Sequence, residues 1–329
     1  MIRKTLAGAA MALALVSPSM PERANAQAYP SRPVTIVVPL AAGTGMDVLV
    51  RLYAEKLAGK LGKPAVIENK PGAALMLAAS YVATSPPDGH TLLVSTSTVM
   101  AINPVLYKSV TYDAQKDFTP ISYYVKSPFI LVVNNDLPVR SVPELIKYAK
   151  ETQTPVTFAS TGIGTGLHLA GEYMKQRFGL NMTHVPYRNT GQQLADIVAG
   201  HVHMSFAEAG ATLPLIRDGK LRVLAVSAAT RVPNLPDVPT FAEAAGVPDF
   251  EVVSWHMLFA PGATPKDIVL RLNKDMNDIM SEPEMQKKIT TIGLLPVGTP
   301  SLEEIRKFIG SEREKWGSLL RKLNLQGTQ

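Results

Sequence analysis

The chain has 329 residues, of which 18% are charged and 46% hydrophobic, so it is long enough for two globular domains and too apolar to be disordered. Its formal net charge is +6, with the basic residues scattered, which argues against a nucleic-acid-binding surface and favours small acids as ligands. It has no cysteine, which excludes disulfides, thiolate metal sites and cysteine nucleophiles.

Residues 1–26 have the pattern of a secretion signal. Arg3 and Lys4 form a basic start, and the apolar stretch from Leu6 to Val16 is too short to span a bilayer comfortably. A small-x-small cleavage site ends at Ala26, and no cysteine follows that could carry a lipid. We therefore expect cleavage after Ala26 rather than an uncleaved anchor. The mature protein should be soluble and exported, which in a Gram-negative cell means the periplasm.

After this leader, an apolar strand over 35–39 runs into a loop of small residues, Leu40 to Asp47. Apolar residues then recur at helical spacing from Leu49 to Leu61, and Gly62 ends that helix. A helix that starts in a loop points free N–H groups into it, and such groups attract carboxylates and phosphates. The loop is therefore a candidate anion site.

Strand and helix patterns continue to alternate towards the middle of the chain. Strands are predicted over 65–68 and 91–94, and two apolar strands, 121–125 and 129–133, are predicted with an interruption at Pro128. A helix over 142–151 follows. The alternation predicts an α/β fold with mainly parallel sheets.

A second strand–loop–helix unit repeats the design of the first. The strand Val156–Ala159 leads into a Ser-Thr-Gly-Ile-Gly-Thr-Gly run over 160–166, and helical spacing begins at Leu167. The glycines let the backbone approach a ligand, and Thr165 is a candidate N-cap. An ordinary strand-to-helix turn would have the same pattern. Together the two units suggest two lobes whose helix starts face one ligand.

Neither loop is a nucleotide-binding fingerprint. Leu167 and Val48 stand where a dinucleotide loop needs its third glycine, and no Gly-Lys-Ser/Thr phosphate loop occurs. Strands over 183–186, 202–206, 221–227 and 251–259, and helices over 192–199, 213–217 and from 265, complete the alternation. Ligands in such folds lie beyond the carboxyl ends of the strands, so the candidate site comprises 40–47, 95–100 and 160–168.

Several short motifs occur in an order and spacing that resemble one family. They are Tyr29-Pro30-Ser31-Arg32-Pro33-Val34, Glu68-Asn69-Lys70-Pro71-Gly72-Ala73, Pro87-Asp88-Gly89-His90-Thr91-Leu92-Leu93, His184-Val185-Pro186-Tyr187, Leu235-Pro236-Asp237-Val238-Pro239-Thr240, Ser254-Trp255 and Ala260-Pro261-Gly262-Ala263-Thr264-Pro265. Together they resemble the extracytoplasmic solute receptors of tripartite tricarboxylate transporters, the Bug family, over the whole mature chain. The resemblance implies a type II periplasmic binding protein whose two α/β lobes close on a small carboxylate and deliver it to a membrane permease.

The resemblance also implies two crossover strands that form a hinge, which we place near 122–127 and 252–256. Lobe 1 is then discontinuous, 27–125 plus 252–329, and lobe 2 is 126–251. We expect a monomer that needs no cofactor or metal and binds no nucleic acid.

In that family the ligand carboxylate is held by the loop after the first strand and by the Gly-rich loop of the second lobe, largely through backbone N–H groups, hydroxyls and water. Asp47 and His168 match family residues, although a first-turn acid and a packing histidine would look the same. Glu208 ends a strand of lobe 2. Because a buried carboxylate facing an anion is costly, it should bind an amine or hydroxyl, or point away. The predicted ligand-binding residues are Leu40, Ala42, Gly43, Thr44, Met46, Asp47, Thr96, Ser97, Met100, Ser160, Thr161, Gly162, Gly164, Thr165, Gly166, His168 and Glu208.

The sequence departs from the family pattern near this site. Apolar residues stand at or beside positions that are usually polar or glycine, namely Leu40, Met46, Leu75, Met76, Met100, Ile163 and Leu167. Those that face the cleft would pack against carbon atoms and leave extra carboxylates unpaired. We therefore expect an apolar-bodied carboxylate, such as an aromatic mono- or dicarboxylate, rather than citrate.

The sequence also bears on two other classes of function. A hydrolase has little support, because no Gly-x-Ser-x-Gly elbow occurs and the six histidines show no metal-binding spacing. The other class is a periplasmic receptor that presents its carboxylate to a sensor kinase, and the sequence alone does not separate this from transport.

Overall fold

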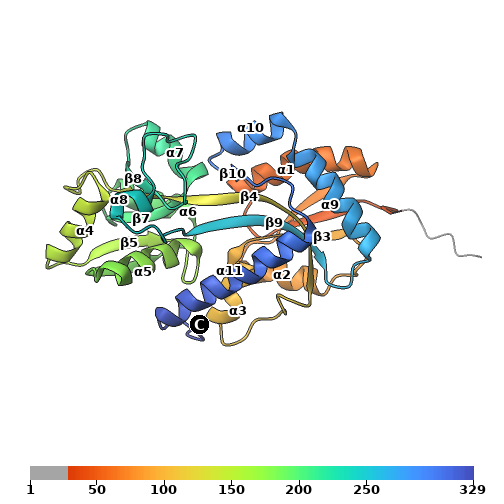
Figure 1. Cartoon of the computed structure of the whole chain (residues 1–329), viewed down its shortest axis with the longest axis horizontal. Helices are drawn as coiled ribbons and strands as arrows, with labels where there is room; N and C mark the ends of the chain where they lie inside the picture. The colour runs from red at the N-terminus through yellow and green to blue at the C-terminus, as the bar shows by residue number, and fades with distance from the viewer. Residues whose placement is uncertain (1–28) are drawn as a thin grey trace, which may run out of the picture.

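Two long strands, β4 (Phe118–Val133) and β9 (Val253–Pro261), join two lobes and form a central ribbon (Figure 1). In this computed structural model, which describes residues 29–329, the strands pair antiparallel from Phe118 opposite Pro261 to Pro128 opposite Val253. They overlap the two segments expected to form the hinge. The predicted leader lies outside the described residues. The two-lobed α/β architecture is confirmed, while the residue boundaries of the lobes stay a prediction.

The sequence predicted an interruption at Pro128, but β4 is continuous across this residue. The reason is a change of partner. Up to Pro128 the strand pairs with β9, and from Phe129 it pairs with β7 (Met204–Glu208) and β8 (Arg222–Val226). Phe129 also donates its N–H to the hydroxyl of Ser227 over 2.9 Å. A proline lacks this donor, and it stands where β4 exchanges partners and a ladder bond is least needed.

Lobe 1 is built on a short parallel sheet, in which β1 (Val34–Val38) pairs with both β2 (Ala65–Asn69) and β3 (Thr91–Ser95). β3 then pairs antiparallel with β9 and so attaches the sheet to the ribbon. The other elements of this lobe are α1 (Gly45–Leu61), η1 (Ala73–Leu75), α2 (Met76–Ala83), η2 (Thr98–Ile102), α3 (Asn103–Leu106), α9 (Lys266–Met280), α10 (Pro283–Thr291), β10 (Leu295–Pro296) and α11 (Leu302–Lys322).

Lobe 2 has a similar plan, with β5 (Val156–Ser160) parallel to both β6 (Met182–Pro186) and β7. Its helices are α4 (Val142–Glu151), α5 (Gly166–Phe178), α6 (Thr190–Val198), α7 (Ala209–Arg217) and α8 (Phe241–Ala245). Every pairing that involves β4 or β9 is antiparallel. The expected parallel order therefore holds only for the outer strands of each lobe.

The ribbon has two different faces, because side chains alternate along a strand. Trp255 and Met257 of β9 point into a core shared with α11, whereas Leu258 and Ala260 point into a core shared with α1, α9 and α10. Figure 1 shows α11, α3 and α5 on one side of β4 and β9, and α1, α10 and α7 on the other. We call the α11 side the covered face and the α1 side the open face.

On the covered face, α11 reaches from lobe 1 into lobe 2. Trp316 and Leu320 of α11, with Leu106 of α3, lie in the same hydrophobic core as Phe129 and Phe158 of lobe 2. The two lobes are therefore tied together on this side by apolar packing. No helix within residues 29–329 combines the length and apolar character needed to cross a membrane.

Candidate functional site

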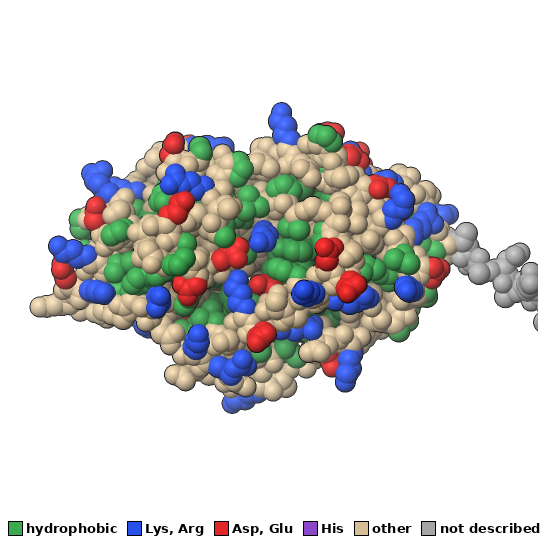
Figure 2. Space-filling model, viewed as in Figure 1, with side chains coloured by type: hydrophobic (Ala, Val, Ile, Leu, Met, Phe, Trp, Pro, Cys, Tyr) green, Lys and Arg blue, Asp and Glu red, His purple; other side chains and the backbone are tan. Residues whose placement is uncertain are grey.

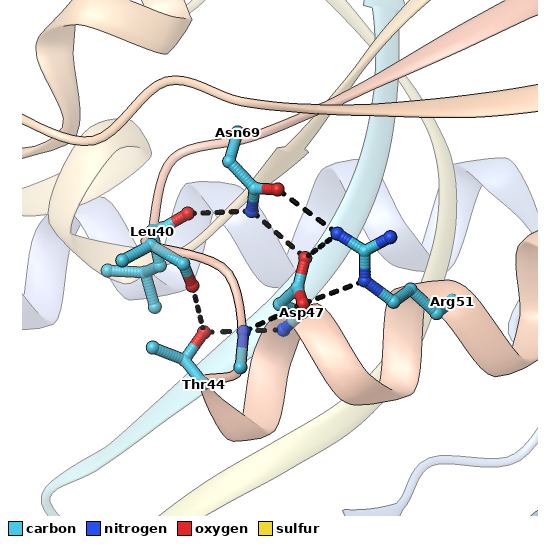
Figure 3. A network of polar contacts seen from close by, with 7 residues as sticks. Leu40, Thr44, Asp47, Arg51 and Asn69 are labelled. Atoms are coloured by element: carbon cyan, nitrogen blue, oxygen red, sulfur yellow. Dashed lines mark hydrogen bonds and ion pairs between the residues drawn. The ribbon is translucent and has the colours of Figure 1, made fainter.

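The loop that precedes α1 is held by the carboxylate of Asp47, which is 1% exposed. Asp47 accepts hydrogen bonds from the Gly43 N–H (2.9 Å), from Arg51 Nε and Nη2 (2.9 and 3.0 Å) and from Asn69 Nδ2 (2.9 Å) (Figure 3). Asn69 Nδ2 also donates to the carbonyl of Leu40 over 2.9 Å. Burial opposes the charge on Asp47, but the bonds from Arg51, Gly43 and Asn69 outweigh it and hold the pKa of this carboxyl below its usual value.

This network leaves the first N–H groups of α1 available to a ligand. Thr44 is the N-cap, and its side chain accepts from the N–H of Asp47 over 3.4 Å, while its carbonyl accepts from Val48 over 2.9 Å. The N–H groups of Gly45 and Met46 precede these bonds and have no partner within the helix. They carry the positive end of the helix dipole, as the sequence suggested.

A second helix start faces the start of α1, but it belongs to α7 rather than to α5. A Cβ atom built on Gly210, near the start of α7, would lie 4.0 Å from the Cα of Gly45 and 3.6 Å from the carbonyl oxygen of Ile292. The sequence predicted a helix only over 213–217. The earlier start at Ala209 was missed because its N-cap, Glu208, makes no side-chain capping bond and Pro214 stands inside the helix.

Between these helix starts, on the open face, lies a cavity of about 520 Å³ whose walls come from both lobes. Six predicted residues line it: Leu40, Ala42, Gly43, Thr44, Met46 and Glu208. Gly45, inside the predicted segment 40–47, also lines it. The lining residues outside the predicted segments and residues are Val48, Ser127, Thr190, Ala209, Gly210, Ala211, Leu213, Pro214, Arg217, His256, Thr291, Ile292 and Leu294. Ser127 and His256 belong to β4 and β9. The sequence could have predicted them as lining residues only if it had shown which side chains of these strands point to the open face.

Three ionisable side chains line the cavity, Glu208, Arg217 and His256, and none of them makes a hydrogen bond or ion pair within residues 29–329. Burial shifts the pKa values of two of these, His256 and Glu208. His256 is 6% exposed, burial lowers its pKa to about 4, and its Nδ1 has no hydrogen-bond partner among residues 29–329. Glu208, across the cavity at the end of β7, is partly exposed to it, and burial raises the pKa of its carboxyl. Both groups are therefore biased towards their neutral forms.

The Gly-rich loop before α5 does not line this cavity. Thr165 is the N-cap of α5, as predicted, and accepts from the N–H of His168 over 3.3 Å. A Cβ atom on Gly164 would lie 1.9 Å from Leu106 of α3, and one on Gly166 would lie 2.8 Å from the ring of Phe129. The loop is thus packed against the covered face. The predicted binding roles of Ser160, Thr161, Gly162, Gly164, Thr165, Gly166 and His168 stay a prediction.

Two histidines, His168 and His184, form contacts that hold the Gly-rich loop before α5. His184 Nε2 and the Ser160 hydroxyl lie 2.7 Å apart, and the rings of His184 and His168 are 4.1 Å apart. The Nδ1 atom of His168 accepts from the Gly164 N–H over 3.1 Å. Burial, with the neighbouring histidine next, lowers the pKa of His168 to about 3, and burial lowers that of His184 to about 4. Ser160 is fully buried, so this serine–histidine pair orders the loop.

The third predicted segment follows β3 and is buried. The Ser97 hydroxyl lies 3.2 Å from that of Ser254 in β9, and the Thr96 hydroxyl has no partner within the part of the chain that the structure describes. Met100 is fully buried in the covered-face core. None of the three lines the cavity, and their role in binding also stays a prediction.

The seven apolar residues noted in the sequence divide between the cavity and the protein interior. Leu40 and Met46 line the cavity. Leu167 and Met100 are core residues, Leu75 and Met76 pack against the covered-face core, and Ile163 is 38% exposed. The cavity is nevertheless lined largely by carbon atoms, because Leu213, Pro214, Ile292 and Leu294 complete its wall.

The outer surface shows no single-sign patch on the face drawn in Figure 2, where Lys and Arg alternate with Asp and Glu around hydrophobic side chains near the middle. Within residues 29–329, no cluster of three or more His, Asp and Glu side chains is arranged to hold a metal ion.

Two α/β lobes, two crossover strands and a cavity between helix starts of both lobes define a two-lobed solute-binding protein. The chain belongs to the receptor family of the tripartite tricarboxylate transporters, since the model of the "Tripartite tricarboxylate transporter family receptor" matches residues 49–325. The resemblance seen in the sequence is confirmed.

Individual relatives agree with this assignment. Protein BugT of Bordetella pertussis is 33% identical over 90% of this chain and 91% of its own length. Among solved structures, Rhodopseudomonas palustris Rpa4515 with adipate is 35% identical with a TM-score of 0.84, covering 90% of this chain and 98% of that one. MatC (Rpa3494) of the same organism, with bound malate, is 31% identical with a TM-score of 0.79, covering 89% and 100%.

Proposed function

We propose that this chain is a periplasmic receptor that binds one small carboxylate in the cavity between α1 and α7 and delivers it to the membrane subunits of a tripartite transporter. The observation that carries the proposal is the convergence of two helix N-termini, one from each lobe, on one cavity. Each N-terminus attracts negative charge, and a ligand that contacts both favours closure of the lobes. The role is binding by a monomer, with no reaction and no cofactor.

The ligands named for two relatives support a carboxylate. Rpa4515 is described with adipate and MatC with malate, and both are small dicarboxylic acids. The lining of the present cavity favours the ligand with more carbon surface. Burying ~150 Å² of such surface would contribute about 4 kcal/mol at ~25 cal/mol per Å². We therefore propose an apolar-bodied carboxylate, aliphatic or aromatic, in preference to citrate.

A thermal-shift panel tests the ligand class. Adipate, malate, citrate, aspartate, benzoate and terephthalate would each be added to the mature protein, and the melting temperature recorded. We expect the largest increase from adipate or an aromatic acid and little from citrate. If citrate or aspartate gives the largest increase, the apolar-body argument is wrong. If no acid raises the melting temperature, the proposed function fails.

A pair of glycine variants locates the site. Gly210→Val would fill the space between α7 and α1 and should abolish the shift, because the new side chain stands within about 4 Å of Gly45 and Ile292. Gly59→Val, in a part of α1 where a Cβ meets nothing within 4 Å, is the matched control and should keep it. Equal shifts in both variants would remove this cavity from the site.

Export is tested on the protein recovered from cells. N-terminal sequencing of the periplasmic protein should begin at Gln27, and a retained Met1 would contradict the predicted cleavage.

Delivery to a permease is tested by uptake. Cells that lack the receptor should lose uptake of the radiolabelled acid, and Gly210→Val should not restore it. If uptake is unchanged while an acid-dependent change in transcription is lost, the partner is a sensor kinase instead.

A further inference from the structure

Glu208 is placed where the proposed ligand would bring its own negative charge. It ends β7, is the N-cap of α7 and lines the cavity beside the start of that helix. Its carboxyl makes no hydrogen bond or ion pair with any other residue of the described chain, 29–329. A carboxylate ligand at the α1 and α7 starts would therefore meet a second carboxyl group in the same enclosure.

The charged groups around Glu208 do not neutralise it. The lining contributes two other ionisable side chains, Arg217 and His256, and the pair Asp47–Arg51 lies beneath the α1 loop. Arg217 ends α7, and within residues 29–329 it makes no ion pair with Glu208 at the other end of that helix. His256 is buried and neutral, and Asp47 already holds Arg51. The segment 291–294 contributes no charge.

Two carboxylates that share one low-dielectric site cannot both stay ionised at low cost. Glu208, which has no partner and whose pKa burial already raises, takes the proton, and a protonated carboxyl group gains an O–H donor. That donor suits a ligand oxygen, which accepts hydrogen bonds only. An ammonium group would need the opposite, an ionised Glu208.

We propose that Glu208 binds the ligand as a neutral carboxylic acid, donating its O–H to a ligand carboxylate oxygen, so that each ligand bound takes up one proton from solvent. This inference rests on the proposed function. It makes Glu208 a specificity-determining residue that selects plain carboxylates over amino acids, whose ammonium group would lose the ionised carboxylate as a partner. The unpartnered Nδ1 of His256 gives the same wall a second polar contact.

Calorimetry counts the proton directly. The panel acid that raises the melting temperature most would be titrated into wild-type protein at pH 7 in phosphate and in Tris, whose ionisation enthalpies differ. We expect uptake close to one proton per ligand. Affinity should fall about tenfold per pH unit between the pKa values of Glu208 in the free protein and in the complex.

Two variants separate this role from a structural one. Glu208→Gln keeps the shape and an N–H donor but has no titratable proton, so its binding should take up no proton and its affinity should lose the pH dependence. Glu303→Gln, on an exposed part of α11, is the matched control and should behave as wild type. Binding without proton uptake, or tighter binding of aspartate than of the plain acids, would overturn the Glu208 proposal alone. Absence of binding by every acid would overturn the proposed function as well.

Discussion

The N-terminal ends of α1 and α5 have the same local hydrogen bonds but lie in different surroundings. In each, a threonine caps the helix, Thr44 or Thr165, and the side chain three residues later accepts from a preceding glycine N–H. Asp47 accepts from Gly43 over 2.9 Å, and His168 accepts from Gly164 over 3.1 Å. A Cβ on Gly43 would meet nothing within 4 Å, whereas one on Gly164 would strike Leu106.

The difference lies in which face of the β4–β9 ribbon each start adjoins. The α1 start adjoins the open face, where the cavity and the α7 start stand opposite. The α5 start adjoins the covered face, where α3 and α11 pack over it. A loop motif thus determines the local hydrogen bonds of a helix start, while the neighbours that cover or expose it come from distant parts of the chain.

The largest effect should come from Glu312, which holds the covered face together. Its Oε2 accepts from both of the chain's tryptophans, Trp255 of β9 and Trp316 of α11, each over 2.9 Å, and the residue is 5% exposed. Glu312→Ala would leave two buried indole N–H groups unpaired. We expect a loss of roughly 3 kcal/mol or more in the free energy of unfolding.

Urea unfolding followed by tryptophan fluorescence measures this loss. Glu312→Gln keeps an acceptor oxygen and should lose less. Glu303→Gln, which removes one charge from the first turn of α11, should lose at most about 1 kcal/mol. If Glu312→Ala is as stable as wild type, the hydrogen bonds of Glu312 do not hold α11 against β9 as described.

The next largest effect is the loss of folding stability in acid, because buried histidines on both faces of the ribbon are held in their neutral form. Burial lowers the pKa of His256 to about 4, against an ordinary value of 6.5. The unfolded chain therefore takes up the proton first. This contribution to stability is complete above pH 6.5 and is lost as the pH falls towards 4, by about 3 kcal/mol for His256.

Unfolding free energies at pH 6.5 and pH 4 test the sign. His256→Gln does not titrate, so it should lose less stability than wild type over this range. His168 and His184 on the covered face should act in the same direction, since their pKa values are also lowered. If wild type and His256→Gln lose the same free energy of unfolding between pH 6.5 and pH 4, the lowered pKa of His256 is contradicted.

Much of the fold could be predicted from the sequence, because it depends on local patterns. The α1 helix ends at Gly62, which is left-handed (φ +68°), and Thr165 caps α5 as expected. The alternation of strands and helices predicted the α/β class correctly, and the two matching strand–loop–helix units suggested the two lobes. The continuity of β4 through Pro128 could not be predicted, because it depends on which strand pairs with each half of β4.

The proposed site was less predictable than the fold, for the same reason. The α1 loop was predicted because it follows a strand and precedes an amphipathic helix. The α7 start was missed because Glu208, Ala209 and Gly210 carry no capping pattern. Met100 and Leu167 stand next to predicted site loops in the sequence, and the structure places both side chains in the covered-face cores.

A matched pair of substitutions isolates the two helix starts, with a smaller expected effect. Gly45 and Gly166 are the first residues of α1 and α5. Gly166→Ala would place a Cβ 2.8 Å from the ring of Phe129, which is 2% exposed and cannot easily move aside. We expect a loss of roughly 2 kcal/mol. Gly45→Ala meets nothing within 4 Å and should leave stability unchanged.

Ligand affinity should be lowered by Gly45→Ala rather than by Gly166→Ala, the reverse of the expected effects on stability. The methyl group of Gly45→Ala enters the cavity and should weaken binding of the panel acid, while the ligand site in Gly166→Ala is untouched as long as the protein is folded. Calorimetry at a temperature where both variants are folded measures this. If only Gly166→Ala weakens binding, the ligand site includes the Gly-rich loop before α5 and not the start of α1.

The smallest effect concerns η1, which reaches towards the covered face. Ala73, Ala74 and Leu75 all have positive φ (46°, 49° and 70°), a conformation that L-residues seldom adopt. The carbonyl of Ala74 accepts from Nδ2 of Asn103 in α3 over 2.9 Å, and Asn103 is fully buried. This contact from a distant segment holds the turn in its left-handed form.

Glycine should relieve this turn. A left-handed L-residue costs roughly 1–2 kcal/mol, and glycine adds ~0.5–1 kcal/mol of unfolded-state entropy, so Ala74→Gly should stabilise the protein by about 0.5–1 kcal/mol. Ala83→Gly, at the end of α2 with ordinary helical geometry, is the control and should destabilise by about as much. Urea midpoints compare the two. If both variants lose stability equally, Ala74 is not left-handed, and the covered face does not impose its geometry on this turn.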